Sequence, residues 1–219
     1  YYQWEGFAKA DQWVRWSVWN EMGWLLLPKS TIINSKLDTL LQTGTFSSEQ
    51  GALIENIYTA IGRLIKLNQS LLLLAKIENK LISDVQDIDM QQLVRDKALQ
   101  FQELFEKDGL TLGQEMQPCN VRMSKYLADI LLNNLFSNAI RHNHSGGSIE
   151  IILQAGLLTI SNTGKSEVLD NQLFERFSKS ASSEGTGLGL AISMQICALY
   201  GFTLTYQHLK NRHQFLVIF

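Results

Sequence analysis

Apolar residues recur every three to four positions in the first third of the chain, which predicts that this part is helical. The segment 31–42 carries one such stripe, and Gly44 follows as a helix-ending residue. A longer helix is predicted over 49–81, with Ser47 or Ser48 as its cap, because apolar residues repeat there at both core positions of a heptad. Since one chain supplies only this helical pair, a symmetric dimer would complete a four-helix bundle. A solitary hairpin, the alternative, would leave much leucine exposed.

From about residue 83 the pattern alternates between helical and strand periods. These patterns predict an α+β fold with a helical domain at 1–83 and an α/β sandwich at 84–219. The sandwich is expected to hold a mixed sheet of about five strands covered by three helices. The predicted helices are 90–107, with Leu93, Val94, Leu99, Leu104 and Phe105 inward, 123–143 and 188–200. The predicted strands are 85–88, 110–116, 148–154, 157–161, 202–207 and 214–219.

Composition narrows the class of protein. The net charge is -2 and no Lys/Arg-rich run occurs, which argues against nucleic acid or an anionic membrane as the main partner. The two cysteines are interpreted as reduced thiols of a cytoplasmic protein. No apolar run approaches the roughly 18 residues of a membrane span, so any anchor is expected outside these 219 residues. All five tryptophans fall in the first 24 residues, either as a buried helix or as an aromatic belt near a membrane or partner.

Polar side chains interrupt the apolar stripe of the predicted helix 123–143. Asn134 and Asn138 lie four residues apart and therefore on one helix face, and Arg141 follows three residues later. Two amides and a guanidinium on one side of a packed helix suit a ligand, whereas the alternative is a solvated helix face. The apolar stripe consists of Leu127, Ile130, Leu131, Leu135 and Ile140.

Two further segments combine glycine with polar residues. The glycine-rich segment 185–190 stands at the start of the predicted helix 188–200, where free amide groups would bind an anion such as a triphosphate. Asn162-Thr163-Gly164 ends a predicted strand and offers a side chain to a base edge. Taken singly, the first segment is equally a turn and the second an Asx turn.

Together these segments resemble the motifs of a bacterial sensor histidine kinase catalytic core, of the GHKL ATPase superfamily. The resemblance extends over about residues 31–219 and includes helical stretches similar to the second helix of a dimerisation and phosphotransfer domain. Residues 134–141 resemble the asparagine box, 162–164 the first glycine box, 173–177 the phenylalanine box and 185–190 the second glycine box.

The resemblance implies ATP and Mg²⁺ as cofactors, with Asn138 as a metal ligand and Asn134 close to the ion. Arg141 would face the phosphates. His142 holds a place often taken by tyrosine, and it either stacks on the nucleotide or is a surface histidine. The nucleotide-binding residues implied are Asn134, Asn138, Arg141, His142, Asn162, Gly164, Arg176, Lys179, Gly185, Thr186, Gly187, Leu188 and Gly189.

The chain departs from the family pattern at the first glycine box. Asn162 stands where the family usually has an aspartate that binds the adenine amino group, although the amide oxygen still accepts such a bond. Lys165 replaces the second glycine of that box. Other GHKL enzymes place a glutamate at the position of Asn134 to activate water. Because asparagine is a poor general base, the resemblance favours phosphoryl transfer to protein over ATP hydrolysis.

The resemblance further implies a protein-histidine kinase that forms a homodimer. Phosphate would pass from a histidine to an aspartate on a response-regulator receiver domain, in the cytoplasmic portion of an inner-membrane sensor. The membrane would be reached only through segments outside this chain.

The acceptor histidine of such a kinase is missing from residues 1–83. The four histidines are His142, His144, His208 and His213, all in the predicted ATP-binding domain. Counting back from 32–34 puts Trp24 or Asn20 at the acceptor position, and neither side chain can carry a phosphohistidine. Three alternatives follow: an ATP-binding, dimerising pseudokinase or scaffold, a kinase whose first 30 residues have been altered, or a donor to a partner's histidine.

Overall fold

The structure is a computed structural model that describes residues 32, 33, 35–42, 44, 46–164 and 187–219. The chain divides into two units, Tyr1–Lys76 and Ile77–Phe219. The tryptophan-rich segment 1–24 and the predicted phenylalanine box at 173–177 lie outside the described residues. Within the described residues, no helix is long and apolar enough to cross a membrane.

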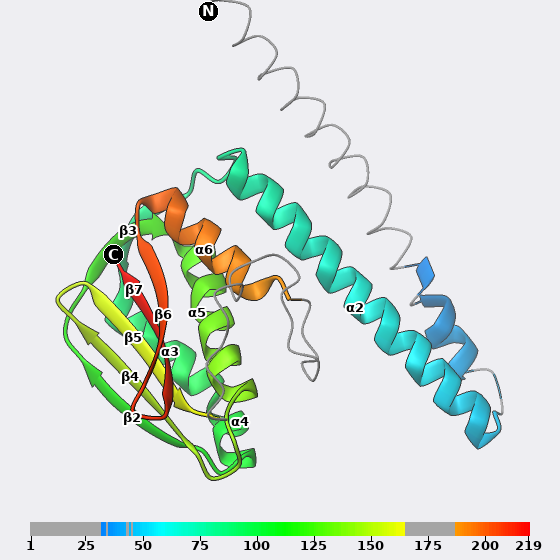
Figure 1. The fold of residues 1–219 in the computed structure, drawn as a ribbon. Helices are drawn as coiled ribbons and strands as arrows, with labels where there is room; N and C mark the ends of the chain where they lie inside the picture. Colours follow the sequence, from blue (N-terminus) through cyan, green and yellow to red (C-terminus); the bar gives the residue numbers. More distant parts are fainter. Residues whose placement is uncertain (1–31, 34, 43, 45, 165–186) are drawn as a thin grey trace, which may run out of the picture. The chain divides into compact units, whose positions relative to one another are not determined.

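A long helix, α2 (Ser48–Glu78), dominates the first unit (Figure 1). Residues 32, 33 and 35–42 are also helical, as predicted. Ser47 caps α2 reciprocally, because its hydroxyl accepts the Gln50 amide N–H at 3.2 Å while its own N–H donates to Gln50 Oε1 at 3.0 Å. The predicted extension of the helix to residue 81 is wrong. Lys80 takes a left-handed φ of 52°, which ends the helical path, and Leu81 lies beyond it and is 53% exposed.

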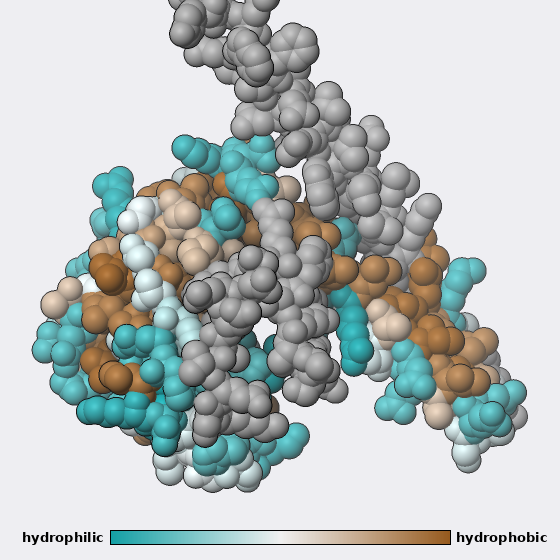
Figure 2. Space-filling model, in the orientation of Figure 1, coloured by the Kyte–Doolittle hydropathy of each residue, from teal (hydrophilic) through white to brown (hydrophobic). Residues whose placement is uncertain are grey.

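The first half of α2 exposes much of its apolar surface within one chain, whereas Leu73, Leu74 and Ile77 near its end are buried. Large apolar side chains with about half of their surface exposed stand at Leu53, Ile57, Tyr58 and Leu64. Figure 2 shows brown, hydrophobic surface along this helix. The exposed leucine expected of a solitary hairpin is therefore present in the monomer.

The second unit contains a five-stranded mixed sheet, as predicted, and its strand order is β2-β4-β5-β7-β6. Only β2 and β4 run parallel, whereas the other neighbours are antiparallel. Helices α3 (Met90–Gln100), α5 (Lys125–Arg141) and α6 (Gly189–Tyr200) lie along one face of this sheet (Figure 1). The strands of the sheet are β2 (Thr111–Met116), β4 (Ser148–Gln154), β5 (Leu157–Thr163), β6 (Thr203–Leu209) and β7 (Arg212–Ile218).

The core fills the space between the sheet and the helices α5 (Lys125–Arg141) and α6 (Gly189–Tyr200). Two hairpin turns align the inward-facing residues of their strands. Ala155 with Gly156, and Lys210 with Asn211, take positive φ at both central positions, as a type I′ turn requires. Buried core residues include Ile149, Ile151, Leu153, Leu158, Ile160 and Val217 from strands, and Leu127, Leu131, Leu135, Ile192 and Ile196 from helices.

A separate two-stranded sheet pairs β1 (Val85–Asp89) with β3 (Asn120–Ser124). The sequence pattern predicts β1 but assigns the end of β3 to the helix 123–143. That boundary is wrong because Ser124 caps α5, its hydroxyl accepting the Leu127 amide N–H at 3.2 Å. Residues 120–123 alternate between exposed and buried, with Val121 and Met123 inward, which is the strand period.

The single helix predicted over 90–107 is divided into α3 (Met90–Gln100) and α4 (Gln102–Lys107). Phe101, between them, takes φ −94° and ψ 0° and stacks on Phe136 at 5.5 Å between ring centroids. Val94 and Phe105 are buried as predicted. Leu99 and Leu104 are exposed, so the prediction that they face the core is wrong: the inward face is held by Val94, Ala98 and Phe105, at helical spacing.

A charged pair joins α3 to α5 beneath this break. The Lys97 side chain is only 2% exposed, and its ammonium contacts Asp129 Oδ1 at 2.5 Å and Gln100 Oε1 at 2.9 Å. The Asp129 side chain is 46% exposed. Because only Asp129 has access to water, the loss of folding stability should depend on which of the two partners is removed.

This asymmetry predicts unequal effects of removing either partner. Asp129→Ala leaves a buried ammonium and is expected to lower the free energy of unfolding by about 2 kcal/mol, below the full buried-pair value because Asp129 is half-exposed. Lys97→Met leaves a carboxylate that water can reach, and is expected to cost less than about 1 kcal/mol. Urea unfolding followed by circular dichroism measures both variants. Asp96→Ala, on the exposed face of α3, is the matched control, and equal losses in the two variants would contradict the prediction.

Candidate functional site

The predicted polar face of α5 contacts the start of α6. Asn134 Nδ2 donates to the Gly189 carbonyl at 2.9 Å and lies 3.3 Å from Ser193 Oγ. Asn138, one turn further along, is half-buried, and its side chain makes no hydrogen bond to another described residue. One asparagine therefore holds two helices together, while the other keeps its amide available for a ligand.

The start of α6 is built to leave its backbone amides open. Leu188 is the N-cap residue, is fully buried and provides no side-chain hydrogen bond to the helix. No acidic residue occupies the first turn, and Gly187 takes a left-handed φ of 70°. The free N–H groups of a 12-residue helix, with no carboxylate in the first turn, suit an anion such as phosphate.

The end of β5 lies against the C-terminal end of α5. Asn162 is 1% exposed, and its Nδ2 donates to the Thr163 carbonyl at 2.8 Å and to the His142 carbonyl at 3.5 Å. A Cβ at Gly164 would lie 2.6 Å from His213 Cδ2 and 2.8 Å from the His142 carbonyl oxygen, closer than side chains approach. Glycine is therefore required there, because the backbone passes directly beside the end of α5.

A polar network behind this strand end was missed by the sequence reasoning. The Thr163 hydroxyl donates to Asn143 Oδ1 at 2.6 Å and accepts the Ser148 amide N–H at 2.8 Å. Asn143 Nδ2 in turn donates to the Ser148 carbonyl at 3.3 Å. Arg212 completes the network from β7, donating to Ser148 Oγ at 2.7 Å and Ser161 Oγ at 3.2 Å.

The signals for this network in the sequence were weak. Thr163 is the middle residue of a motif in which only the first and last positions were assigned a role. Asn143 stands just beyond the asparagine box, and Arg212 is distant from both motifs along the chain. The sequence gives no signal for Gly147 beyond its being a glycine. In the structure, a Cβ at this position would collide with Asn143 and Thr163.

Two basic residues follow the asparagines. Arg141 ends α5, is exposed, and forms no ion pair with another described residue. Burial lowers the pKa of His142, and the charges of Arg141 and His213 lower that pKa further. His142 is therefore a neutral imidazole near pH 7, and it adds no charge to the site.

The structure brings most of the predicted site residues into one region. Asn134 contacts Gly189, and the segment 162–164 contacts His142. Arg176, Lys179, Gly185 and Thr186 lie outside the described residues. No group of three or more His, Cys, Asp or Glu side chains that could hold a metal occurs among the described residues. The available ligands for a hard cation are amide oxygens and phosphate, which suits Mg²⁺ because it retains several waters and binds through nucleotide phosphates.

Residues 127–218 match the family model of histidine kinase-, DNA gyrase B- and HSP90-like ATPases. The chain is 32% identical over 191 residues to the heme sensor protein HssS of Staphylococcus saprophyticus, covering 83% of this chain and 41% of that protein. The chain thus spans well under half the length of this curated relative.

Solved structures share the fold. The Acinetobacter baumannii histidine kinase AdeS superposes with a TM-score of 0.62 at 20% identity, covering 85% of this chain and 92% of that one. Full-length ShkA in complex with AMPPNP superposes with a TM-score of 0.65 at 19% identity, covering 88% of this chain and 44% of that one.

The Thr163 hydroxyl is predicted to hold the end of β5 against the residues that follow α5. Thr163→Val keeps the side-chain shape but leaves the Ser148 N–H without its partner and Asn143 Oδ1 with only the His144 N–H, and should lower the free energy of unfolding by about 1–3 kcal/mol. Thr163→Ser retains the hydroxyl and is the matched control, expected to lose less than about 1 kcal/mol. Urea unfolding measures both, and a valine variant as stable as the serine variant would refute the role of the hydroxyl.

Proposed function

We propose that this chain, which belongs to the sensor histidine kinases of the GHKL ATPase superfamily, binds Mg-ATP and transfers the γ-phosphoryl group to a histidine. The observation that carries the proposal is the hydrogen bond from Asn134 Nδ2 to the Gly189 carbonyl. Through it, the open amides of α6 come beside the helix face that presents Asn138. An anion site and a neutral amide ligand for a cation then adjoin each other, as Mg-ATP requires.

Each predicted residue receives a role in this arrangement. Asn138 would ligate the cation through its amide oxygen, with Asn134 close by, and Mg²⁺ would supply charge that offsets the phosphates. The amides of residues 187–189, preceded by Gly185 and Thr186, would bind phosphate oxygens. Arg141 would add a positive charge that increases in value as the γ-phosphoryl group leaves.

The adenine base would lie at the end of β5. Asn162 Nδ2 already donates to two carbonyls, so Oδ1 is the atom that remains to accept a bond from the adenine amino group. Gly164 allows the close backbone approach, and the neutral ring of His142 would stack on the nucleotide. Arg176 and Lys179 would close over the phosphates from the segment between the two glycine boxes.

Transfer to protein is favoured over hydrolysis by the chemistry of Asn134. An amide cannot take a proton from water, and its nitrogen is engaged with Gly189. The reaction would therefore need a nucleophile from protein, a histidine, from which the phosphate passes to an aspartate of a response-regulator receiver domain. The chain would act as a homodimer in which two copies of α2 cover each other's exposed apolar stripe, within the cytoplasmic portion of an inner-membrane sensor.

A second candidate function is an ATP-binding, dimerising pseudokinase or scaffold. One observation favours it: residues 1–83 contain no histidine. The two functions share nucleotide binding and differ in the fate of the phosphate. Two experiments therefore address them separately.

Nucleotide binding is expected to raise the melting temperature of the full chain. At a concentration of 100 times Kd, Mg-ATP would stabilise the folded state by about 2.7 kcal/mol. Asn138→Ala removes the proposed cation ligand and should abolish most of the magnesium-dependent part of the shift. Asn133→Ala, at the exposed neighbouring position of α5, is the matched control and should keep it. Equal shifts of the melting temperature in the two variants would contradict the proposal that Asn138 binds the cation.

Phosphoryl transfer is tested by restoring an acceptor. The unaltered chain incubated with γ-labelled ATP should gain no acid-labile, base-stable label, because residues 1–83 contain no histidine. Asn20→His, which is followed by Glu21, or Trp24→His should gain such a label if the catalytic unit is competent. Labelling of the unaltered chain would contradict the expectation that it has no histidine able to accept the phosphoryl group. Failure of both variants, with Mg-ATP binding intact, would favour the scaffold.

A further inference from the structure

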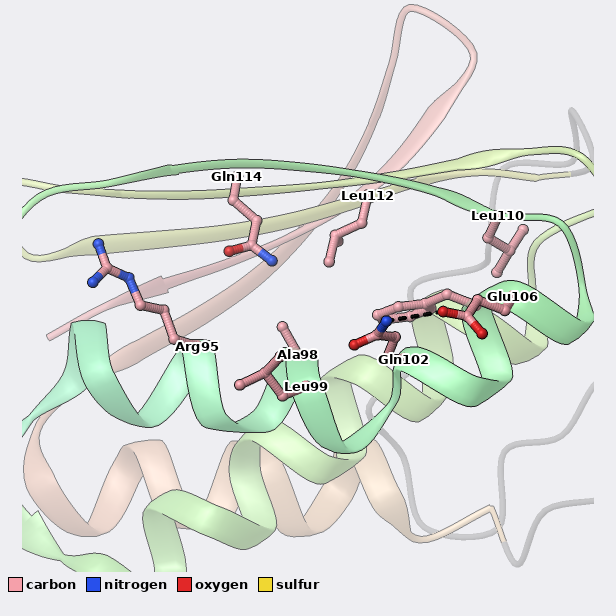
Figure 3. A pocket seen from close by; sticks show the side chains of 9 residues that line it. Arg95, Ala98, Leu99, Gln102, Glu106, Leu110, Leu112 and Gln114 are labelled. Carbon is pink, nitrogen blue, oxygen red and sulfur yellow. Dashed lines mark hydrogen bonds between the residues drawn. The ribbon is translucent and has the colours of Figure 1, made fainter.

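A groove lies away from the proposed nucleotide site, between the edge strand β2 and the pair of helices α3 and α4 (Figure 3). Its volume is about 450 Å³. Residues of both α3 and α4, on either side of the break at Phe101, line it. Its lining comprises Arg95, Ala98, Leu99, Gln102, Phe105, Glu106, Leu110, Leu112 and Gln114.

One wall of the groove is the free edge of the five-stranded sheet. In the parallel pair β2–β4, the amides of Thr111 and Gln117 donate to the Gly147 and Leu153 carbonyls of the β4 side. Odd-numbered residues of β2 therefore bond to β4, so the N–H and C=O of Leu112 and Gln114 face away from it. The carbonyl of Met116 follows this alternation, since it accepts the Gln91 side chain at 2.8 Å on the outer side.

The other wall presents apolar surface between two opposite charges. Leu99 is 66% exposed at the mouth, above the buried residues Ala98, Phe105 and Leu110. Arg95 lies at the end near Gln114, and Glu106 lies at the end near Leu110 (Figure 3). Arg95 forms no ion pair with another described residue, whereas the Glu106 carboxylate accepts the Gln102 side-chain N–H at 2.9 Å.

We propose that the groove binds an extended peptide segment of a partner protein, which adds to the sheet as a strand beside β2. The N–H and C=O groups of Leu112 and Gln114 would pair with the peptide backbone. Alternate apolar side chains of the peptide would enter the groove over Leu99. An acidic residue of the peptide would face Arg95, and a basic one would face Glu106.

The lining favours a peptide over a small molecule. Five of the nine lining residues are exposed, so the groove cannot enclose most of a ligand's surface as a small-molecule pocket does. The N–H and C=O groups at a strand edge also recur at the spacing of the N–H and C=O groups of an extended peptide, so the two can pair. The site is independent of the proposed kinase activity, because none of the residues that line it belongs to the nucleotide site.

The test uses the full chain and fluorescein-labelled seven-residue peptides. They alternate valine and threonine, with aspartate at one end and lysine at the other, and both orders are prepared. Fluorescence polarisation should detect binding of one order in preference to the other. Gln114→Pro removes an N–H that points to the edge while sparing the bonds to β4, and should weaken binding about tenfold relative to the control Gln114→Ala. Arg95→Glu makes both ends of the groove acidic, so the preference for one peptide order should be lost.

A peptide N-methylated at alternate residues tests strand addition on the unaltered chain, should the proline variant not fold. Its affinity is expected to fall about tenfold when the methylated groups are those that face β2. Equal binding of methylated and unmethylated peptides, equal binding to the Gln114 variants, or no binding of either order would overturn the proposal. Binding of a fluorescent ten-carbon carboxylate in place of the peptides would also overturn it, in favour of a small apolar acid.

Discussion

The hydrogen bond from the Thr163 hydroxyl to Asn143 Oδ1 is the interaction on which the geometry of the site depends. It joins the end of β5 to the residues that follow α5, two segments that are distant in sequence. The same hydroxyl accepts the Ser148 N–H, so the first residue of β4 is fixed by the same atom. Glycines at 147 and 164 are the consequence, since no side chain fits where three backbone segments approach so closely.

The two asparagines on one face of α5 differ in their hydrogen bonding. Asn134 uses its amide nitrogen to bond the start of α6, whereas the Asn138 side chain makes no hydrogen bond to another described residue. If both asparagines were engaged in packing, no neutral ligand would remain for a cation. If neither were, the open amides of α6 would have no fixed distance from α5. In the proposed Mg-ATP site, this division would hold the amides of α6 in place while leaving Asn138 to bind and release the cation.

The sequence pattern predicted those parts of the fold that depend on interactions between residues close together in the chain. The spacing of Asn134 and Asn138, the five-stranded sheet and its two hairpins follow from periodicity and turn chemistry alone. The break at Phe101 did not, because the apolar spacing continues through it, and the contact that Phe101 makes there is with Phe136 on another helix. The end of strand β3 was likewise assigned to the following helix, because the sequence does not show that the Ser124 hydroxyl caps that helix through its bond to Leu127.

Side-chain networks between distant segments are the least accessible to such reasoning. Arg212 reaches Ser148 and Ser161 only because β7 pairs with β5 in one register, and that register is a property of the whole sheet. Hydrogen bonds of the same sheet connect the Thr163 network to β2, the strand at the groove. Gly147, held beside Asn143 and Thr163, accepts the amide of Thr111 at the start of β2. The strand that offers its free edge to a peptide is therefore aligned by the same contacts that hold the end of β5 against α5.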